Sequence, residues 1–498
     1  MTDRFLHGIE IVEINEGARS VRTVKSSVIG LVGTAPDAAG AQRAELTVGS
    51  GNAALRVVAK QAGVVGNALR LELCAAAEPN QPLAIAVDGR APGLILILVT
   101  LASDADGQRI STASDVAAAL NADDDTKALI EAAALGDGAG IMQSTLGPKA
   151  LDGGMDEPFP LNVPVLITNR RLIPHLGQSG TLPWAIAGIY DQSAPMIYVV
   201  RVAEGSTMSE TISHVIGGRD AAGQLTGINA LLTTRAEIKP RILIAPGFSH
   251  NKPVADALIS VAHKLRAIAV IDGPNTSDEA AIDYRAQFGS ERAYLVDPWL
   301  MVRRPDGSQA PEPASARVAG LIALSDEING FWASPSNQVI RGVLRPARSL
   351  SWAIDDPNTQ ANYLNEFGVA TFIVHDGVRL WGNRSCATDP RWSFLCVRRT
   401  ADMINESLLY AHLWAVDRNI TKTYVDEVTE GVNAYLRQLK AKGAILGGKC
   451  WADPDLNTPE AIADGRVYFD FDFTPTYPAE HITFRSRMVG DYLEEIFK

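Results

Sequence analysis

The segment Arg466–Thr474 reads RVYFDFDFT and predicts a β-strand with two unlike faces. Its apolar face consists of Val467, Phe469, Phe471 and Phe473, and its polar face of Tyr468, Asp470, Asp472 and Thr474. Such strict alternation is typical of a half-buried strand. A second alternating run follows, with Ile482, Phe484, Ser486 and Met488 on one face and Thr483, Arg485 and Arg487 on the other. Two strands make a marginal sheet, so we expect further strands to complete it.

Bulk composition predicts a folded protein of several domains. The 498 residues predict about two to four domains. Hydrophobic content of 46% and charged content of 20% are ordinary for a globular chain, and a net charge of −12 disfavours general nucleic-acid binding. The longest apolar run, Gly93–Leu101, is too short to span a bilayer, and the N-terminus lacks the apolar stretch of a signal peptide. We therefore expect folding in a cytoplasm.

The four cysteines, Cys74, Cys386, Cys396 and Cys450, are scattered and include no C-x-x-C pair. Reduced thiols are the default for such a chain, although spacing alone leaves open whether Cys386, Cys396 or Cys450 ever pair.

Changes in composition and in the spacing of apolar segments along the chain indicate its division into domains. Residues 39–152 are rich in small residues and short alternating segments, which predicts an inserted β-rich domain. Residues 153–345 alternate apolar strands with helices, for example RILIA at 241–245, a helix at 254–266 and IAVI at 268–271, which predicts a mostly parallel α/β layer. We assign 21–38 together with 346–478 to a separate core domain with helices at 400–419 and 423–442, the latter capped by Thr423. The ends, 1–20 and 479–498, form two arms.

A search for chemistry finds no catalytic, cofactor-binding or metal-binding residues to predict. Gly443–Cys450 nearly spells a phosphate-binding loop, but Cys450 replaces the required hydroxyl and the run follows a helix, so a helix cap and turn is the favoured interpretation. Ser249 and His250 follow a predicted strand, where α/β proteins bind ligands, yet they lack a third partner. The eight histidines show no metal-binding spacing. The absence of a catalytic constellation and the presence of unpartnered strands favour a structural protein over an enzyme.

Several motifs in order along the chain resemble the contractile-phage tail sheath protein family. The motifs are HGIEIVEI at 7–14, RTVK at 22–25, VIGLVGTA at 28–35, GVVGN at 63–67, WGNR at 381–384, RRT at 398–400, HLWAVD at 412–417, GVN at 431–433 and FDFTP at 471–475. The segment around 63–67 resembles the insertion domain of longer sheath proteins. No single motif is diagnostic, and the middle of the chain matches more loosely.

The resemblance implies an α+β multidomain subunit that polymerises as stacked hexameric rings around a tail tube and contracts to drive the tube through the host envelope. It implies donated strands at Ile9, Ile11, Val12 and Ile14 and at Ile482, Phe484 and Met488. The implied receiving sheet contains Val28, Leu31, Val467, Phe469, Phe471 and Phe473. The helix at 423–442 is our candidate for the tube-facing surface, through Arg437, Lys440 and Lys442.

The implied partners are further copies of the chain, a tail tube protein, and baseplate and tail terminator proteins, without nucleic acid or membrane insertion. The implied location is the virion tail, after assembly in the host cytoplasm. Two alternatives remain at this point: the sheath of a related injection particle, pyocin-like or part of a secretion system, and an α/β enzyme whose site is not recognised.

Overall fold

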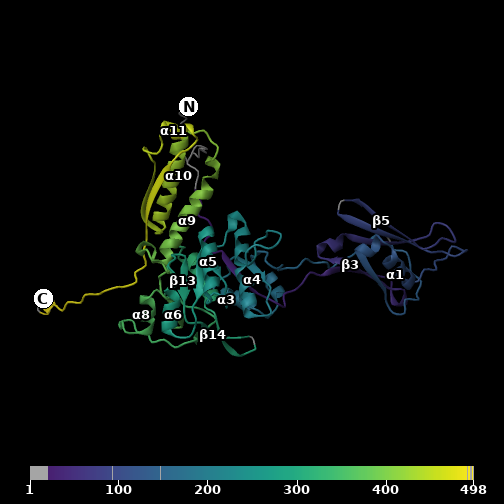
Figure 1. The fold of residues 1–498 in the computed structure, drawn as a ribbon, viewed down its shortest axis with the longest axis horizontal. Coiled ribbons are helices and arrows are strands. Elements are labelled where there is room, and N and C mark those ends of the chain that lie inside the picture. The colour runs from purple at the N-terminus through teal and green to yellow at the C-terminus, as the bar shows by residue number, and fades with distance from the viewer. Residues whose placement is uncertain are drawn as a thin grey trace. The chain divides into compact units, whose positions relative to one another are not determined.

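A computed structural model describes residues 21–91, 93–145, 147–304, 306–490, 492, 493 and 496. The protein is mixed α+β with several sheets. The described residues form two compact units. The first contains the chain up to Pro36, Leu161–Arg170 and the chain from Ser179 onward, and the second contains Asp37–Pro160 and Arg171–Gln178. Figure 1 shows both units and labels several of their elements.

A six-stranded sheet forms the centre of the first unit, in the order β13-β12-β11-β1-β10-β9. The strands are β1 (Ile29–Thr34), β9 (Val165–Ile167), β10 (Ile197–Val202), β11 (Ile242–Ile244), β12 (Ile268–Asp272) and β13 (Ala293–Val296). All neighbours are parallel except β9, which is antiparallel to β10 at one edge. Nearly every residue of the parallel strands is buried, which is why these segments are apolar throughout rather than alternating.

Helices cover both faces of this sheet. On one face, α4 (Met208–Ile216) and α5 (Lys252–Leu265) share a core with alternate strand residues such as Leu243 and Ile271. On the other, α3 (Leu182–Tyr190) packs against α7 (Ser315–Ile328), and α7 contacts β11 and β12. The parallel layer predicted for 153–345 therefore has the two-sided cover that buried parallel strands require.

Smaller elements complete the lower part of the first unit. They are α6 (Asp278–Arg285), α8 (Gln360–Glu366), a sheet of β14 (Leu300–Arg303), β15 (Gln309–Glu312) and β16 (Arg345–Pro346), and a hairpin of β17 (Thr371–Val374) and β18 (Val378–Trp381).

The second unit is built mainly from strands. One sheet contains β2 (Arg43–Val48), β3 (Leu55–Ala62) and β7 (Ile130–Ala134); the other contains β5 (Ala84–Ala91), β6 (Leu94–Leu101), β4 (Leu69–Ala75) and β8 (Lys149–Ala150). Helix α1 (Ala113–Ala122) and the short α2 (Thr126–Leu129) join them around an aliphatic core. Thr112 and Asp115 form the capping box of α1.

The C-terminal part of the first unit combines two long helices with a two-stranded sheet. Its elements are α9 (Leu395–Ala411), α10 (Lys422–Ala441), β19 (Ile445–Ala452), α11 (Pro459–Ala463) and β20 (Phe469–Pro475). Thr421, not the predicted Thr423, caps α10 by accepting a hydrogen bond from the amide of Tyr424. The helix ends before Gly443, which adopts a positive φ of 79°.

Two predictions about sheet membership are wrong. Residues 28–32 were expected in one sheet with 466–474. Instead β1 lies inside the α/β sheet, where β10 and β11 occupy both of its edges, so it has no edge to offer to a donated strand. The partner of β20 is β19, which was interpreted as a helix cap and turn because of its glycine pair.

Candidate assembly site

The strands β19 and β20 form a two-stranded antiparallel sheet. The register pairs Cys450 with Phe471, Lys449 with Asp472 and Trp451 with Asp470. Among the described residues, neither strand has a second neighbour in the sheet. Backbone donors and acceptors at the edges of such a small sheet can pair with strands from other chains.

The apolar face of this sheet packs on α10. Phe469, Phe471 and Phe473 border a core made by α9, α10 and β19, in which Leu436 and Tyr435 are buried. The side-chain amide of Asn433 on α10 accepts a bond from the Cys450 amide (2.8 Å) and donates to the Cys450 carbonyl (3.0 Å). This pairing fixes β19 on the helix and occupies the backbone N–H and C=O of Cys450, so neither group is available to another strand.

An apolar groove of about 340 Å³ opens beside the sheet. Its lining includes Leu408, His412, Tyr424, Val428, Phe469 and Phe471. Val416 at the rim is 62% exposed and Leu413 nearby is 72% exposed. Exposed apolar side chains gathered in this way are typical of interaction surfaces.

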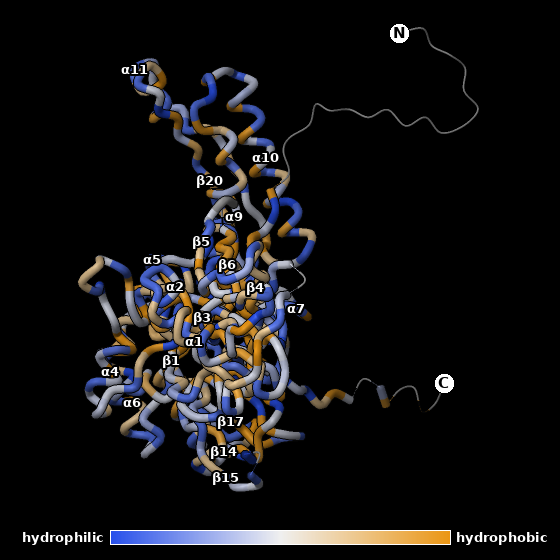
Figure 2. Tube along the Cα trace, turned by 90° about the vertical axis from the view of Figure 1, so that its right-hand side faces the viewer, coloured by the Kyte–Doolittle hydropathy of each residue, from blue (hydrophilic) through white to orange (hydrophobic). Residues whose placement is uncertain are grey.

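The segment after β20 makes no strand of its own. Ile482, Phe484 and Met488 are 66%, 93% and 103% exposed, although they form the apolar face predicted for a strand. Figure 1 draws this segment in yellow leading to the C-terminus, and Figure 2 shows hydrophobic positions along it. The alternating face thus has no cover among the described residues.

The root of this segment is held to the body of the unit. Arg384 contacts the carboxylate of Glu480 through Nε (3.1 Å to each oxygen) and Nη2 (2.6 Å). Tyr477 meets Phe394 edge to face with ring centroids 6.2 Å apart, within the roughly 4.5–7 Å typical of aromatic pairs. The chain therefore becomes free only after residue 480.

The outward face of the sheet carries carboxylates. Asp470 and Asp472 lie on it, and Lys449 opposes Asp472. Asp453, in the loop after β19, shares a hydrogen bond with Asp470, and this contact raises the pKa of Asp470. The same Asp453 accepts backbone bonds from Leu456 and Asp455, which lower its own pKa.

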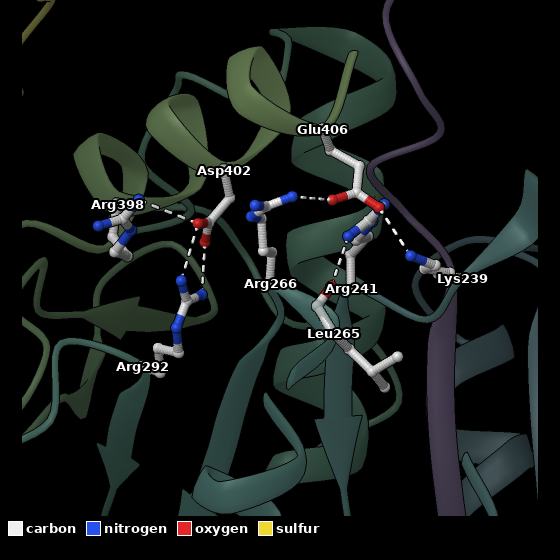
Figure 3. A network of polar contacts seen from close by, with 8 residues as sticks. All are labelled: Lys239, Arg241, Leu265, Arg266, Arg292, Arg398, Asp402 and Glu406. Carbon is white, nitrogen blue, oxygen red and sulfur yellow. Dashed lines mark hydrogen bonds and ion pairs between the residues drawn. The ribbon is translucent and has the colours of Figure 1, made fainter. Parts of the chain in front are cut away.

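A network of buried ion pairs joins α9 to the central sheet (Figure 3). The Glu406 carboxylate contacts Lys239 (3.0 Å), Arg241 (3.0 Å) and Arg266 (2.7 Å), and its side chain is only 2% exposed. Burial alone would raise the pKa of Glu406, but the three cations outweigh it and lower that pKa to about 2.

One turn earlier on α9, Asp402 repeats the pattern. It pairs with Arg292 and with Arg398, while the next residue, Arg399, binds Asp326 of α7 at 2.5 and 2.6 Å. Arg241, Arg266 and Arg292 each lie just before one of the parallel strands β11, β12 and β13. The helix is thus fixed to the amino ends of three strands by charges that are matched within the protein.

The predicted site residues are distributed as follows. Ile9, Ile11, Val12 and Ile14 lie outside the described residues. Val28 and Leu31 are buried at the α/β sheet, away from any free edge. Val467 lines the groove and precedes β20, which contains the three phenylalanines. Arg437, Lys440 and Lys442 lie at the end of α10 and are exposed, with Arg437 paired to Glu430.

The Ser249–His250 pair does not form a catalytic arrangement. Ser249 is fully buried, and its hydroxyl donates to Asp272 (2.9 Å), which also accepts from the hydroxyl of Ser315 (2.6 Å). Burial raises the pKa of Asp272 to about 6 despite these bonds. His250 packs edge-on against Trp299 instead of approaching the hydroxyl as a base. The network ties the end of β12 to the start of α7.

The described residues contain neither a cluster of metal-binding side chains nor a helix long and apolar enough to cross a membrane. The four cysteines are free thiols. Burial raises the pKa of Cys386, Cys396 and Cys450 to about 11, so each stays protonated at neutral pH.

Sequence comparison identifies relatives over the whole chain. Three family models match: the phage tail sheath protein central domain at residues 218–386, the phage tail sheath C-terminal domain at 387–488, and the domain III N-terminal region of a tail sheath protein at 147–202. The tail sheath protein of Escherichia phage P2 is 38% identical over 68% of this chain and 88% of its own length. That of Burkholderia phage BcepMu is 32% identical over 99% of this chain and 98% of its own.

Solved structures share the fold at lower identity. A chain from the contracted baseplate of the anti-feeding prophage superposes with a TM-score of 0.54 at 20% identity, covering 66% of this chain and 90% of the other. The extent and identity of the sequence matches show that the chain belongs to the phage tail sheath protein family, as a structural, non-enzymatic protein of a contractile phage tail or a related injection system.

Proposed function

We propose that this sheath protein polymerises as stacked hexameric rings around a tail tube and that exchanged strands link the subunits. The observation that carries the proposal is the combination of an open two-stranded sheet with an uncovered alternating segment at the C-terminus. The sheet lacks further strands, and the alternating segment lacks a sheet to join. Each chain carries both features. Contacts of this head-to-tail kind propagate into a helical assembly instead of closing a dimer.

Neither β19 nor β20 has a second neighbouring strand among the described residues, and the chain has two arms. We assign one edge to the C-terminal arm of a neighbour, through Ile482, Phe484 and Met488, and the other to an N-terminal arm, through Ile9, Ile11, Val12 and Ile14. The arms would convert a marginal two-stranded sheet into a four-stranded one. Val467, Phe469, Phe471 and Phe473 remain our receiving residues, and Val28 and Leu31 are removed from that set.

The exposed apolar side chains make such a link strong. Burying one large apolar side chain contributes roughly 1.5–3 kcal/mol, so the three of the C-terminal arm together contribute up to about 5–9 kcal/mol before the cost of ordering the arm. Ladder hydrogen bonds add direction. A tether of this strength can hold neighbours together while the bodies of the subunits change their mutual packing.

We infer that the exchanged strands also allow the assembly to contract without coming apart. The subunit bodies would shift from a metastable extended packing to a better-packed one, ring by ring from the baseplate to the tail terminator, while the arms keep the lattice connected. The movement would drive the tube through the host envelope. Contact with the tube must break during contraction, so a polar surface suits it, and we assign Arg437, Lys440 and Lys442 to that role.

Electron microscopy of the purified full chain tests the proposal. We expect rings or tubes from the intact chain, and folded monomers after deletion of residues 1–20 or 479–498. Because the N-terminal deletion stops short of Val21, which belongs to the core, circular dichroism should match the intact chain. Tubes that persist without both arms would contradict strand exchange.

A further inference from the structure

The two partners of the proposed exchange carry opposite charges on the same face. In the arm, Arg485 and Arg487 lie on the face opposite Phe484. In β20, Asp470 and Asp472 lie on the face opposite Phe471. If the apolar faces of arm and strand form one continuous layer, alternation places both arginines and both aspartates together on the outer face.

We propose that the C-terminal arm of a second copy adds to the free edge of β20, with Arg485 and Arg487 facing Asp470 and Asp472, and that this pairing sets the register. The inference rests on the strand exchange proposed above and specifies its partner surface. None of the described lysines and arginines forms an ion pair with Asp470 or Asp472, and Arg485 and Arg487 have no described acidic partner. The two aspartates and the two arginines can therefore form ion pairs with each other when the arm of one copy meets the strand of another.

The charges of the arm and the sheet also indicate whether the C-terminal arm adds beside β19 or beside β20. On the outer face of β19 lies Lys449, which an arm at that edge would bring beside its arginines. Neighbouring strands are about 4.8 Å apart, so an arm at the β19 edge would meet Asp472 only across a second strand. Like charges directly opposite are destabilising, and the β20 edge avoids them. The β19 edge is left for the N-terminal arm, whose segment at 9–14 contains Glu10 and Glu13 and no basic residue.

The spacing restricts the register as well as the edge. The two arginines are separated by one residue, and so are the two aspartates. A slip of one residue would turn the arginines into the phenylalanine layer. A slip of two residues would retain one ion pair and lose the other. In the free chain, Asp453 shares a hydrogen bond with Asp470, and this contact raises the pKa of Asp470.

A peptide of residues 479–490, labelled and added in trans to the full chain, tests the pairing directly. We expect reversal in the peptide (R485E with R487E), or in the chain (D470K with D472K), to raise Kd about tenfold. The two reversals combined should return Kd to within about threefold of the original. A matched control is E279K, which reverses an exposed carboxylate of α6 and should leave Kd unchanged.

The outcomes separate this inference from the proposed exchange. A peptide that binds equally well before and after both reversals overturns the charge-set register and leaves strand exchange standing. If the wild-type peptide does not bind, the same reversals in the full chain decide through electron microscopy: tubes lost on each reversal and regained in combination support the pairing, and tubes unaffected by either reversal overturn it. Tubes that form without residues 479–498 overturn C-terminal strand exchange itself.

Discussion

Arg292 and Asp402 form a buried bidentate ion pair, with 2.7 Å between Nη1 and Oδ2 and 2.9 Å between Nη2 and Oδ1. The pair joins the start of β13 to the middle of α9, and Glu406 joins the same helix to Arg241 and Arg266. Charges buried in matched sets hold one geometry, because a shift of the helix would leave several of them unpaired. We infer that the helices carrying the open sheet move as one body with the α/β sheet.

Removing Asp402 should therefore destabilise the subunit strongly. The substitution Asp402→Ala leaves Arg292 and Arg398 buried without a counter-charge, and breaking a buried pair in this way costs about 3–5 kcal/mol. Urea denaturation measures the free energy of unfolding. Asp464→Ala is the matched control, because it removes an exposed partner of Arg466 and should cost less than about 1 kcal/mol. Equal losses for the two variants would contradict the role assigned to the junction.

Glu406 should make stability depend on acid. Its folded pKa of about 2 lies below the ordinary value of 4.5, so its contribution is fully present above pH 4.5 and is lost as the pH falls toward 2. The shift corresponds to stabilisation on the order of 3 kcal/mol at neutral pH. In Glu406→Gln, unfolding free energy should be lower at pH 7 and should fall less between pH 4.5 and pH 2.5 than in the parent. Parallel pH profiles would contradict this.

Asp272 should act in the opposite direction. Its folded pKa of about 6 lies above the ordinary 3.8, so in the folded state it retains a proton that the unfolded chain releases, and its effect on stability declines as the pH rises from 4 to 6. Asp272→Asn should remove this decline while retaining an oxygen that can accept from Ser249 or Ser315. Thermal unfolding at pH 4, 5 and 6 measures the difference between the two profiles. An unchanged slope would contradict the assignment to Asp272.

The exposed end of α10 should matter for assembly on the tube and not for folding. Reversal of Arg437, Lys440 and Lys442 to glutamate changes solvated side chains, so the melting temperature should stay within a few degrees of the parent. Co-assembly with purified tube protein should be lost, as judged by co-sedimentation and microscopy. Reversal of Arg303 and Arg304, exposed near the end of β14, is the control and should leave co-assembly intact. Normal co-assembly of the α10 variant would contradict the tube assignment.

The sequence predicts those elements whose pattern is local. The strands β10 to β13 are apolar runs between helices, and β20 alternates without interruption, so their positions follow from the residues alone. The sheet to which a strand belongs cannot be predicted in this way, because the segment VIGLVGT at 28–34 contains no information about which strands it pairs with. The strand β19 was not predicted, because two adjacent glycines are typical of a loop. The backbone of Gly447 and Gly448 nevertheless pairs with Thr474 and Phe473.

The ion pairs between α9 and the central sheet correspond to only a weak pattern in the sequence. A basic residue stands just before each of three apolar strands, at Arg241, Arg266 and Arg292, and two carboxylates lie four residues apart on α9. Burial of these charges could not be foreseen, because charged positions at strand and helix ends are usually solvated. Only the packing of α9 over the sheet shows that they meet.

The contact between Arg384 and Glu480 should control how effectively the C-terminal arm reaches a neighbour. Residues 481–488 span at most about 29 Å when extended, so the point at which the arm leaves the body limits its targets. Glu480→Ala removes the anchor, and a loosened root must lose more conformational freedom when the arm binds. We expect fewer and shorter tubes by electron microscopy, with an unfolding free energy within about 1 kcal/mol of the parent because the pair is partly exposed. The charge swap of Arg384→Glu with Glu480→Arg should restore tube length, which neither single reversal should do. Parent-like tubes from Glu480→Ala would show that the arm finds its partner sheet without a fixed root.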